Sequence, residues 1–198
     1  MTGVQTCALP ISIGGRHNRG TNIDQNFDHY QVEYTFDDGT KFFYYGRTIT
    51  GCKDEFSSIA HGARGMATIS IGGHHLGRQG AGKIFNSQLM KSKDQAWAFP
   101  PDKAGDPYEN EWDDLMDAIR NNKPYNEVKR GAEASMITSM GRHAAHTGQE
   151  ITWEDFYNHD HEFAPNVDKL TLTSDSPLMA VNGKYPVPQP GKITKREY

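Results

Sequence analysis

The chain has 198 residues, of which 35% are hydrophobic and 23% charged, and its formal net charge is -4. This length fits one ordinary domain, and the 9 Phe, 9 Tyr and 3 Trp exclude a disordered chain, because disordered segments are poor in aromatic residues. The acidic balance, without a long Lys or Arg cluster, excludes nucleic acid as an expected partner, and the chain lacks the roughly 18 consecutive apolar residues that predict a membrane span.

The first residues do not resemble evolved protein. Residues 2–11 read as a translated high-throughput sequencing adapter, and they lack the basic start and the apolar run of about 7 to 15 residues of a secretory signal. We therefore expect residues 1–12 to be a non-native segment and the natural start to be missing. The remainder is expected to form a partial domain at 13–175 and a Pro-rich extended tail at 176–198.

The next part of the chain has the pattern of antiparallel strands. Residues 29–37 alternate in polarity, and residues 41–49 are rich in aromatic and β-branched side chains, so the turn residues Asp38 and Gly39 between them predict a hairpin. Two further strands are expected at 66–71 and near 83–86.

After residue 101 the period changes to that of helices. Trp112, Leu115, Met116 and Ile119 share one face of a helix expected at about 108–121. A longer helix follows, with Asn126 as its expected N-cap and Gly148 as its left-handed C-cap. Thr152 and Asp155 predict the capping box of a short third helix. Strands followed by helices predict an α+β fold, with an open, mainly antiparallel sheet and helices on one face.

A glycine-rich stretch from Gly77 to Lys83 partly fits the phosphate-binding loop. Ile84 stands where that motif needs Ser or Thr, and the residues after it indicate a strand instead of a helix. We therefore expect no ATP binding.

Three histidine pairs have spacings short enough to share a metal ion: His74 and His75, His143 and His146, and His159 and His161. No cysteine or carboxylate accompanies them at a recognised spacing, so we expect solvated surface histidines and no metal site. No nucleophile elbow is present, and no Gly-x-Gly-x-x-Gly opens a helix after a strand, so no residue is identified as catalytic or cofactor-binding. Cys52 is expected to be a packed small residue, with no internal disulfide.

Short strings in a shared order carry a resemblance that runs from about Gly14 to Gly191. They include Gly14-Gly15-Arg16, Asp28-His29-Tyr30, His61-Gly62, a run from Glu111 to Glu127, Met140-Gly141-Arg142, Thr147-Gly148-Gln149 and Tyr185-Pro-Val-Pro. In these strings the chain resembles the C-terminal domain of Gfo/Idh/MocA-type oxidoreductases, particularly the bacterial subgroup.

The resemblance implies a parent enzyme in which a Rossmann domain binds NAD or NADP and a sugar or polyol derivative lies between the two domains. It also implies a homo-oligomer that pairs through its sheet face. The catalytic Lys and His of such enzymes would precede Gly14, so this chain is expected to hold no cofactor and to be inactive alone. Localisation stays open between the cytoplasm and export from a bacterial cell.

Three residues are the expected contributors to a substrate pocket. Arg47, Lys53 and His61 flank the end of the hairpin and could hydrogen-bond hydroxyl or carboxylate groups, although each could equally be an ordinary charge at a sheet edge. The rival hypothesis for the whole chain is a noncatalytic module that binds or dimerises through its sheet.

Overall fold

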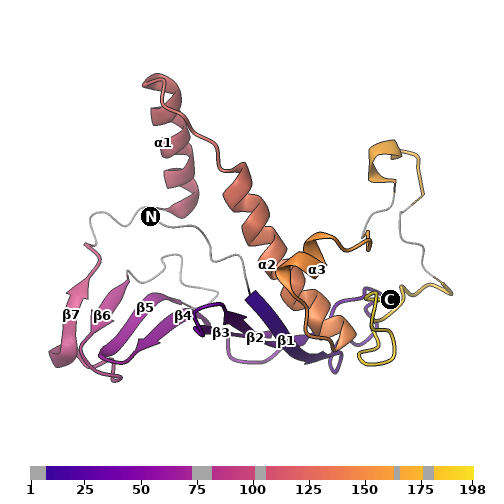
Figure 1. Ribbon diagram of the computed structural model, residues 1–198, viewed down its shortest axis with the longest axis horizontal. Coiled ribbons are helices and arrows are strands. Elements are labelled where there is room, and N and C mark those ends of the chain that lie inside the picture. Colours follow the sequence, from indigo (N-terminus) through magenta and orange to yellow (C-terminus); the bar gives the residue numbers. More distant parts are fainter. Residues whose placement is uncertain (1–7, 73–81, 101–105, 163–165, 176–180) are drawn as a thin grey trace. The chain divides into compact units, whose positions relative to one another are not determined.

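The computed structural model describes residues 8–72, 82–100, 106–162, 166–175 and 181–198. They belong to two compact units, one formed by residues 1–50 and 127–198 and the other by residues 51–126. The expected domain at 13–175 spans both units. Every strand pair in the described ranges is antiparallel, and helices accompany the sheets, which confirms the α+β fold (Figure 1).

The first unit contains a three-stranded sheet in the order β1–β2–β3. Strand β1 (Ala8–Gly15) pairs with β2 (His29–Phe36), and β2 pairs with β3 (Lys41–Arg47). The β2–β3 hairpin confirms the prediction, and Gly39 adopts the positive φ of 81° that such a turn uses. Residues 8–12, which we had left out of the fold prediction, form the first part of β1.

Helix α2 (Val128–Thr147) covers one face of this sheet, lying against β1 and β2 (Figure 1). The covered face carries Val32 and Tyr34, which are buried together with the partly buried Phe36 and Ile137. Alternation along β2 predicts this face, because successive side chains of a strand point to opposite sides. Met140 and Ala144 of α2 form a second core cluster with Ile151.

Both ends of α2 and the start of the next helix follow local capping rules. Gly148 ends α2 in the left-handed conformation with φ 70°, as predicted, whereas the N-cap is Glu127, one residue after the expected Asn126. The short α3 (Trp153–Tyr157) begins as predicted, because the Thr152 hydroxyl accepts a hydrogen bond from the Asp155 amide at 3.0 Å.

The second unit contains a four-stranded sheet in the order β4–β5–β6–β7. Strands β5 (Gly65–Gly72) and β6 (Lys83–Phe85) were predicted, whereas β4 (Phe56–Gly62) and β7 (Gln95–Ala98) were not. The 3-10 turn η1 (Ser92–Asp94) leads into β7.

Helix α1 (Pro107–Arg120) also belongs to the second unit and matches the predicted helix closely. Asp106 caps it by accepting a hydrogen bond from the Tyr108 amide at 2.8 Å. Its predicted apolar stripe is largely exposed, including Trp112, Met116 and Ile119. In the part of the chain that the structure describes, no helix is long and apolar enough to cross a membrane.

The C-terminal segment follows the 3-10 turn η3 (Val167–Lys169) and belongs, like α2, to the first unit. The Tyr185 amide donates to the Ile23 carbonyl at 3.1 Å, and the Gly191 amide donates to the Thr147 carbonyl at the end of α2 at 2.9 Å. Glu197, the penultimate residue, is 0% exposed. The segment is therefore held by the fold at its end, where we had expected only an extended tail on the surface.

Candidate functional site

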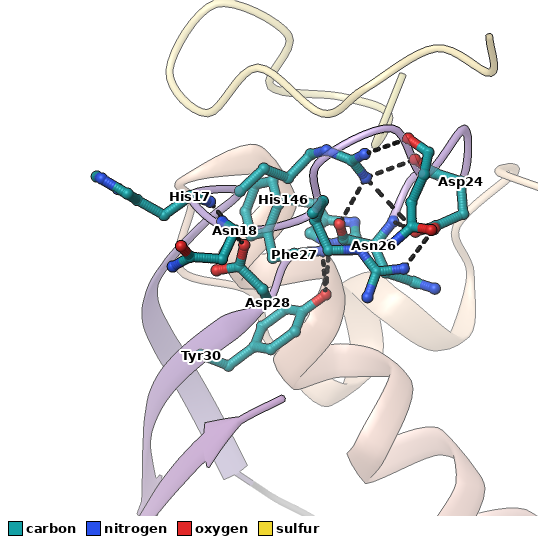
Figure 2. A network of polar contacts seen from close by, with 11 residues as sticks. His17, Asn18, Asp24, Asn26, Phe27, Asp28, Tyr30 and His146 are labelled. Carbon is teal, nitrogen blue, oxygen red and sulfur yellow. Dashed lines mark hydrogen bonds and ion pairs between the residues drawn. The ribbon is translucent and has the colours of Figure 1, made fainter. Parts of the chain in front are cut away.

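A chain of three buried or half-buried polar side chains crosses the first unit. The Tyr30 hydroxyl, from β2, lies 3.0 Å from Nε2 of His146 near the end of α2. Figure 2 shows these two side chains. On its other side, Nδ1 of His146 lies 2.6 Å from Oε2 of Glu197. Both His146 and Glu197 are 0% exposed. Side chains from a strand, a helix and the C-terminal segment thus meet at one buried point.

The hydrogen bonds orient these groups toward one another. The Tyr30 oxygen accepts a hydrogen bond from the Phe27 amide at 3.0 Å and faces Nε2 of His146, while Nδ1 of His146 faces the Glu197 carboxylate. Burial raises the pKa of Tyr30. The Tyr30 phenol therefore keeps its proton across the neutral range. The three side chains are suited to hydrogen bonding between segments of the protein, and less to removing a proton from a substrate.

Three further histidines form a cluster with one member, His143, next to Glu197. His143, one turn before His146 on α2, has its ring centroid 4.9 Å from that of His159 and 6.4 Å from that of His161, and the last two follow α3. Nδ1 of His143 lies 3.8 Å from Oε1 of Glu197. His143 is only 2% exposed, and burial lowers its pKa from 6.5 to about 4, so its imidazole is neutral at pH 7.

These histidines correct the sequence prediction. His143 and His146 were expected on a solvated face of their helix, but every residue of α2 from Met140 to Thr147 is buried except Arg142. Small neighbours, Gly141, Ala144 and Ala145, allow this close packing. In the described ranges, no group of three or more His, Cys, Asp or Glu side chains is arranged to hold a metal ion.

A basic side chain balances the buried carboxylate. Nε of Arg142 lies 3.1 Å from Oε2 of Glu197, and the Arg142 side chain remains partly exposed. A buried carboxylate without a partner would be costly, because removal from water disfavours the charged form. Arg142 and the imidazole of His146 together hold Glu197 in this buried position.

A second polar network orders the loop between β1 and β2 (Figure 2). The fully buried Asp28 carboxylate accepts a hydrogen bond from the His17 amide at 2.7 Å and another from the Asn18 amide, and lies 2.6 Å from Nδ1 of His29. Burial alone would raise the pKa of Asp28, but the hydrogen bonds from Asn18, His29 and His17 outweigh it and lower that pKa. Asp24 similarly holds Arg16 and Arg19.

The three predicted substrate residues lie in different units. Arg47 is exposed at the end of β3 in the first unit, while Lys53 and His61 belong to the second. Lys53 is exposed and lies 3.8 Å from Glu55, whereas Nδ1 of the exposed His61 lies 2.7 Å from Oε1 of Gln88. No contact between Lys53 and His61 is found in the described part of their unit, so their shared role in substrate binding stays a prediction.

Two motifs fall wholly or partly outside the described residues. These are the pair His74 and His75, and the phosphate-loop-like stretch as far as residue 81. Of the latter, Lys83 and Ile84 are described and lie in β6, which confirms that a strand follows the glycines where the phosphate-binding motif needs a helix.

The polar chain itself was missed by sequence reasoning. The run of small residues around His143 and His146 was the available signal, because small side chains at several helical positions indicate close packing on more than one side. No local pattern pointed to Glu197, which lies 51 positions after His146. Neither a protein-family model nor a curated protein matches this chain.

Proposed function

We propose that this chain supplies the substrate-side and pairing surfaces of an NAD(P)-dependent oxidoreductase that acts on a sugar or polyol derivative. A separate part of that protein would hold the dinucleotide and the catalytic Lys and His. The order of sequence strings that resembles the Gfo/Idh/MocA C-terminal domain leads to this proposal. An antiparallel sheet with α2 on one face is consistent with it.

The single observation that supports it best is the outer face of the first sheet, the face opposite Val32 and Tyr34. On this face Ile13 of β1 and Tyr45 of β3 flank Gln31 of β2, and Ile11 and Phe43 flank Glu33 in the same way. Ile13 is 71% and Tyr45 is 69% exposed. Two rows of exposed apolar side chains, one on each side of Gln31 and Glu33, suit a surface that another protein covers.

Substrate contacts would come from the residues predicted for that role. Arg47 lies at the end of β3, where its guanidinium could bind a carboxylate or a pair of hydroxyl groups. Lys53 and His61 would contribute from the second unit. The catalytic proton transfer is assigned to no residue of this chain, since none of the described groups carries the motif for it.

Titration with NADH tests the absence of a dinucleotide site in this chain. The purified chain should cause no saturable change in the fluorescence of NADH or of NADPH. A dehydrogenase with a known dinucleotide domain serves as the positive control. Saturable micromolar binding would contradict the proposal, because it would require a cofactor site within these residues.

A noncatalytic module that binds or dimerises through its sheet is the second candidate, and the same exposed outer face favours it. The natural gene sequence around and upstream of the Ile13 codon, read from a longer DNA contig, separates the two functions. An in-frame Gly-x-Gly-x-x-Gly and a catalytic lysine would favour the oxidoreductase, and a genuine start codon near Ile13 would favour the module.

A further inference from the structure

The end of the chain is anchored to the first unit at separate points along residues 184–198, which we call the strap. The Tyr185 amide is bonded to the Ile23 carbonyl and the Gly191 amide to the Thr147 carbonyl. Figure 1 shows this segment beside the end of α2. Between these bonds and the chain end, Glu197 inserts its carboxylate among side chains of α2.

The strap packs against ionisable groups of the first unit. Glu197 faces Arg142, His143 and His146 on α2. The ring of Tyr198 lies 5.5 Å from that of His161, centroid to centroid. Further charged or titratable neighbours are His159, which packs on His143, Arg196, which acts on His161, and Tyr30, whose hydroxyl lies 3.0 Å from Nε2 of His146.

We propose that the strap is a pH-sensitive latch, docked while the imidazoles of His143 and His161 are neutral and released when they take up protons in mildly acidic solution. The site that it contacts is the cluster of His143, His146 and His161, and the group that it inserts is the Glu197 carboxylate. This device goes beyond the proposed function and does not depend on it.

Linkage gives the direction of the effect. Burial lowers the pKa of His143 to about 4 and also lowers the pKa of His161, whereas release of the strap returns both imidazoles toward water and the usual value of 6.5. The Glu197 charge opposes this by favouring a protonated His143, but Arg142 already offsets that charge and burial prevails. The released form therefore binds more protons between pH 6.5 and 4, and acid favours it.

Hydrogen exchange measured by mass spectrometry can follow the strap directly in the full chain. Its reporters are the bonded amides of Tyr185, Gly191, Lys192 and Ile193, with the β2 amides as an internal reference. After correction for intrinsic exchange, strap protection should fall by about 20-fold from pH 7 to pH 5, on the basis of His143 alone, while β2 protection stays higher than that of the strap.

Matched variants identify the responsible groups. His143→Asn removes one titrating imidazole but keeps a polar atom near Glu197, and it should reduce the pH response of the strap by the factor assigned to His143. His17→Asn, at an exposed histidine, should leave the response unchanged. Glu197→Gln should weaken strap protection at pH 7, whereas Glu150→Gln, at an exposed glutamate, should not.

Three outcomes would overturn the proposal. They are equal strap protection at pH 7 and pH 5, strap protection at pH 5 that is no lower than that of β2, and a full pH response in His143→Asn. The comparison of the strap with β2 in the unmodified chain decides the matter even if a variant does not fold.

Discussion

At the scale of single residues, burial and not the type of side chain determines what the histidines do. His143 and His61 are the same amino acid, yet their surroundings differ. His61 is exposed on a strand and bonded to Gln88, while His143, on α2, is 2% exposed and lies beside Glu197. Removing an imidazole from water penalises its charged form. His143 thus couples the stability of the first unit to pH.

The sign and size of this coupling can be predicted. The pKa of His143 is lowered in the folded chain to about 4, so the unfolded chain binds more protons below pH 6.5, and the stability present above pH 6.5 is lost as the pH falls toward 4. Between pH 7 and pH 5 the free energy of unfolding should fall on the order of 2 kcal/mol from this group. Urea unfolding at both pH values measures it.

The variant His143→Asn should show a smaller difference between the two pH values, whatever its absolute stability, and His17→Asn should keep the full difference. An unfolding free energy of the unmodified chain that is unchanged or higher at pH 5 would show that the His143 imidazole is not buried as described.

At the scale of elements, close approach between α2 and β2 depends on Gly141. A Cβ atom at this position would overlap the hydroxyl of Tyr34, which donates a hydrogen bond to the Ile137 carbonyl at 3.0 Å. The same close packing places His146 against Tyr30 one turn further along the helix. Gly131, in the exposed first half of α2, has no atom within 4 Å of an added Cβ.

These two glycines make a matched pair of substitutions. Gly141→Ala should lower the free energy of unfolding by about 1 to 3 kcal/mol, because the added methyl displaces Tyr34 or α2. Gly131→Ala should raise it by up to about 1 kcal/mol, because alanine favours the helix. Thermal unfolding of both variants measures the contrast, and equal effects of the two substitutions would refute the close contact.

Local sequence signals predicted the elements where one period dominates. The alternation in β2, the Asp38-Gly39 turn, Gly148 and Thr152 all lie where the pattern placed them, since each depends on neighbouring residues alone. β4 was missed because its sequence, FSSIAHG, mixes small and polar residues without a clear alternation. The buried polar site depends on contacts between residues 30, 146 and 197. These residues lie far apart in the sequence, so no local periodic pattern can predict their contacts.

At the scale of the whole molecule, both sheets expose apolar side chains. Ile13, Phe43 and Tyr45 do so in the first unit, and Ile84 and Trp97 form an exposed cross-strand pair in the second. The resemblance implies pairing through a sheet face, but the sequence could not assign the residues of that face, because the strand register decides which side chains share a face. We propose that a second copy of the chain covers the outer face of the first sheet.

Light scattering on the purified chain, across a wide range of protein concentration, tests this claim most directly. We expect the measured mass to be that of two chains. Ile13→Lys or Tyr45→Lys should shift this mass toward that of one chain. Leu172→Lys, which places the same charge at an exposed leucine outside the sheet, should leave the mass unchanged. The mass of one chain at every concentration, or a dimer that neither sheet variant disturbs, would contradict it.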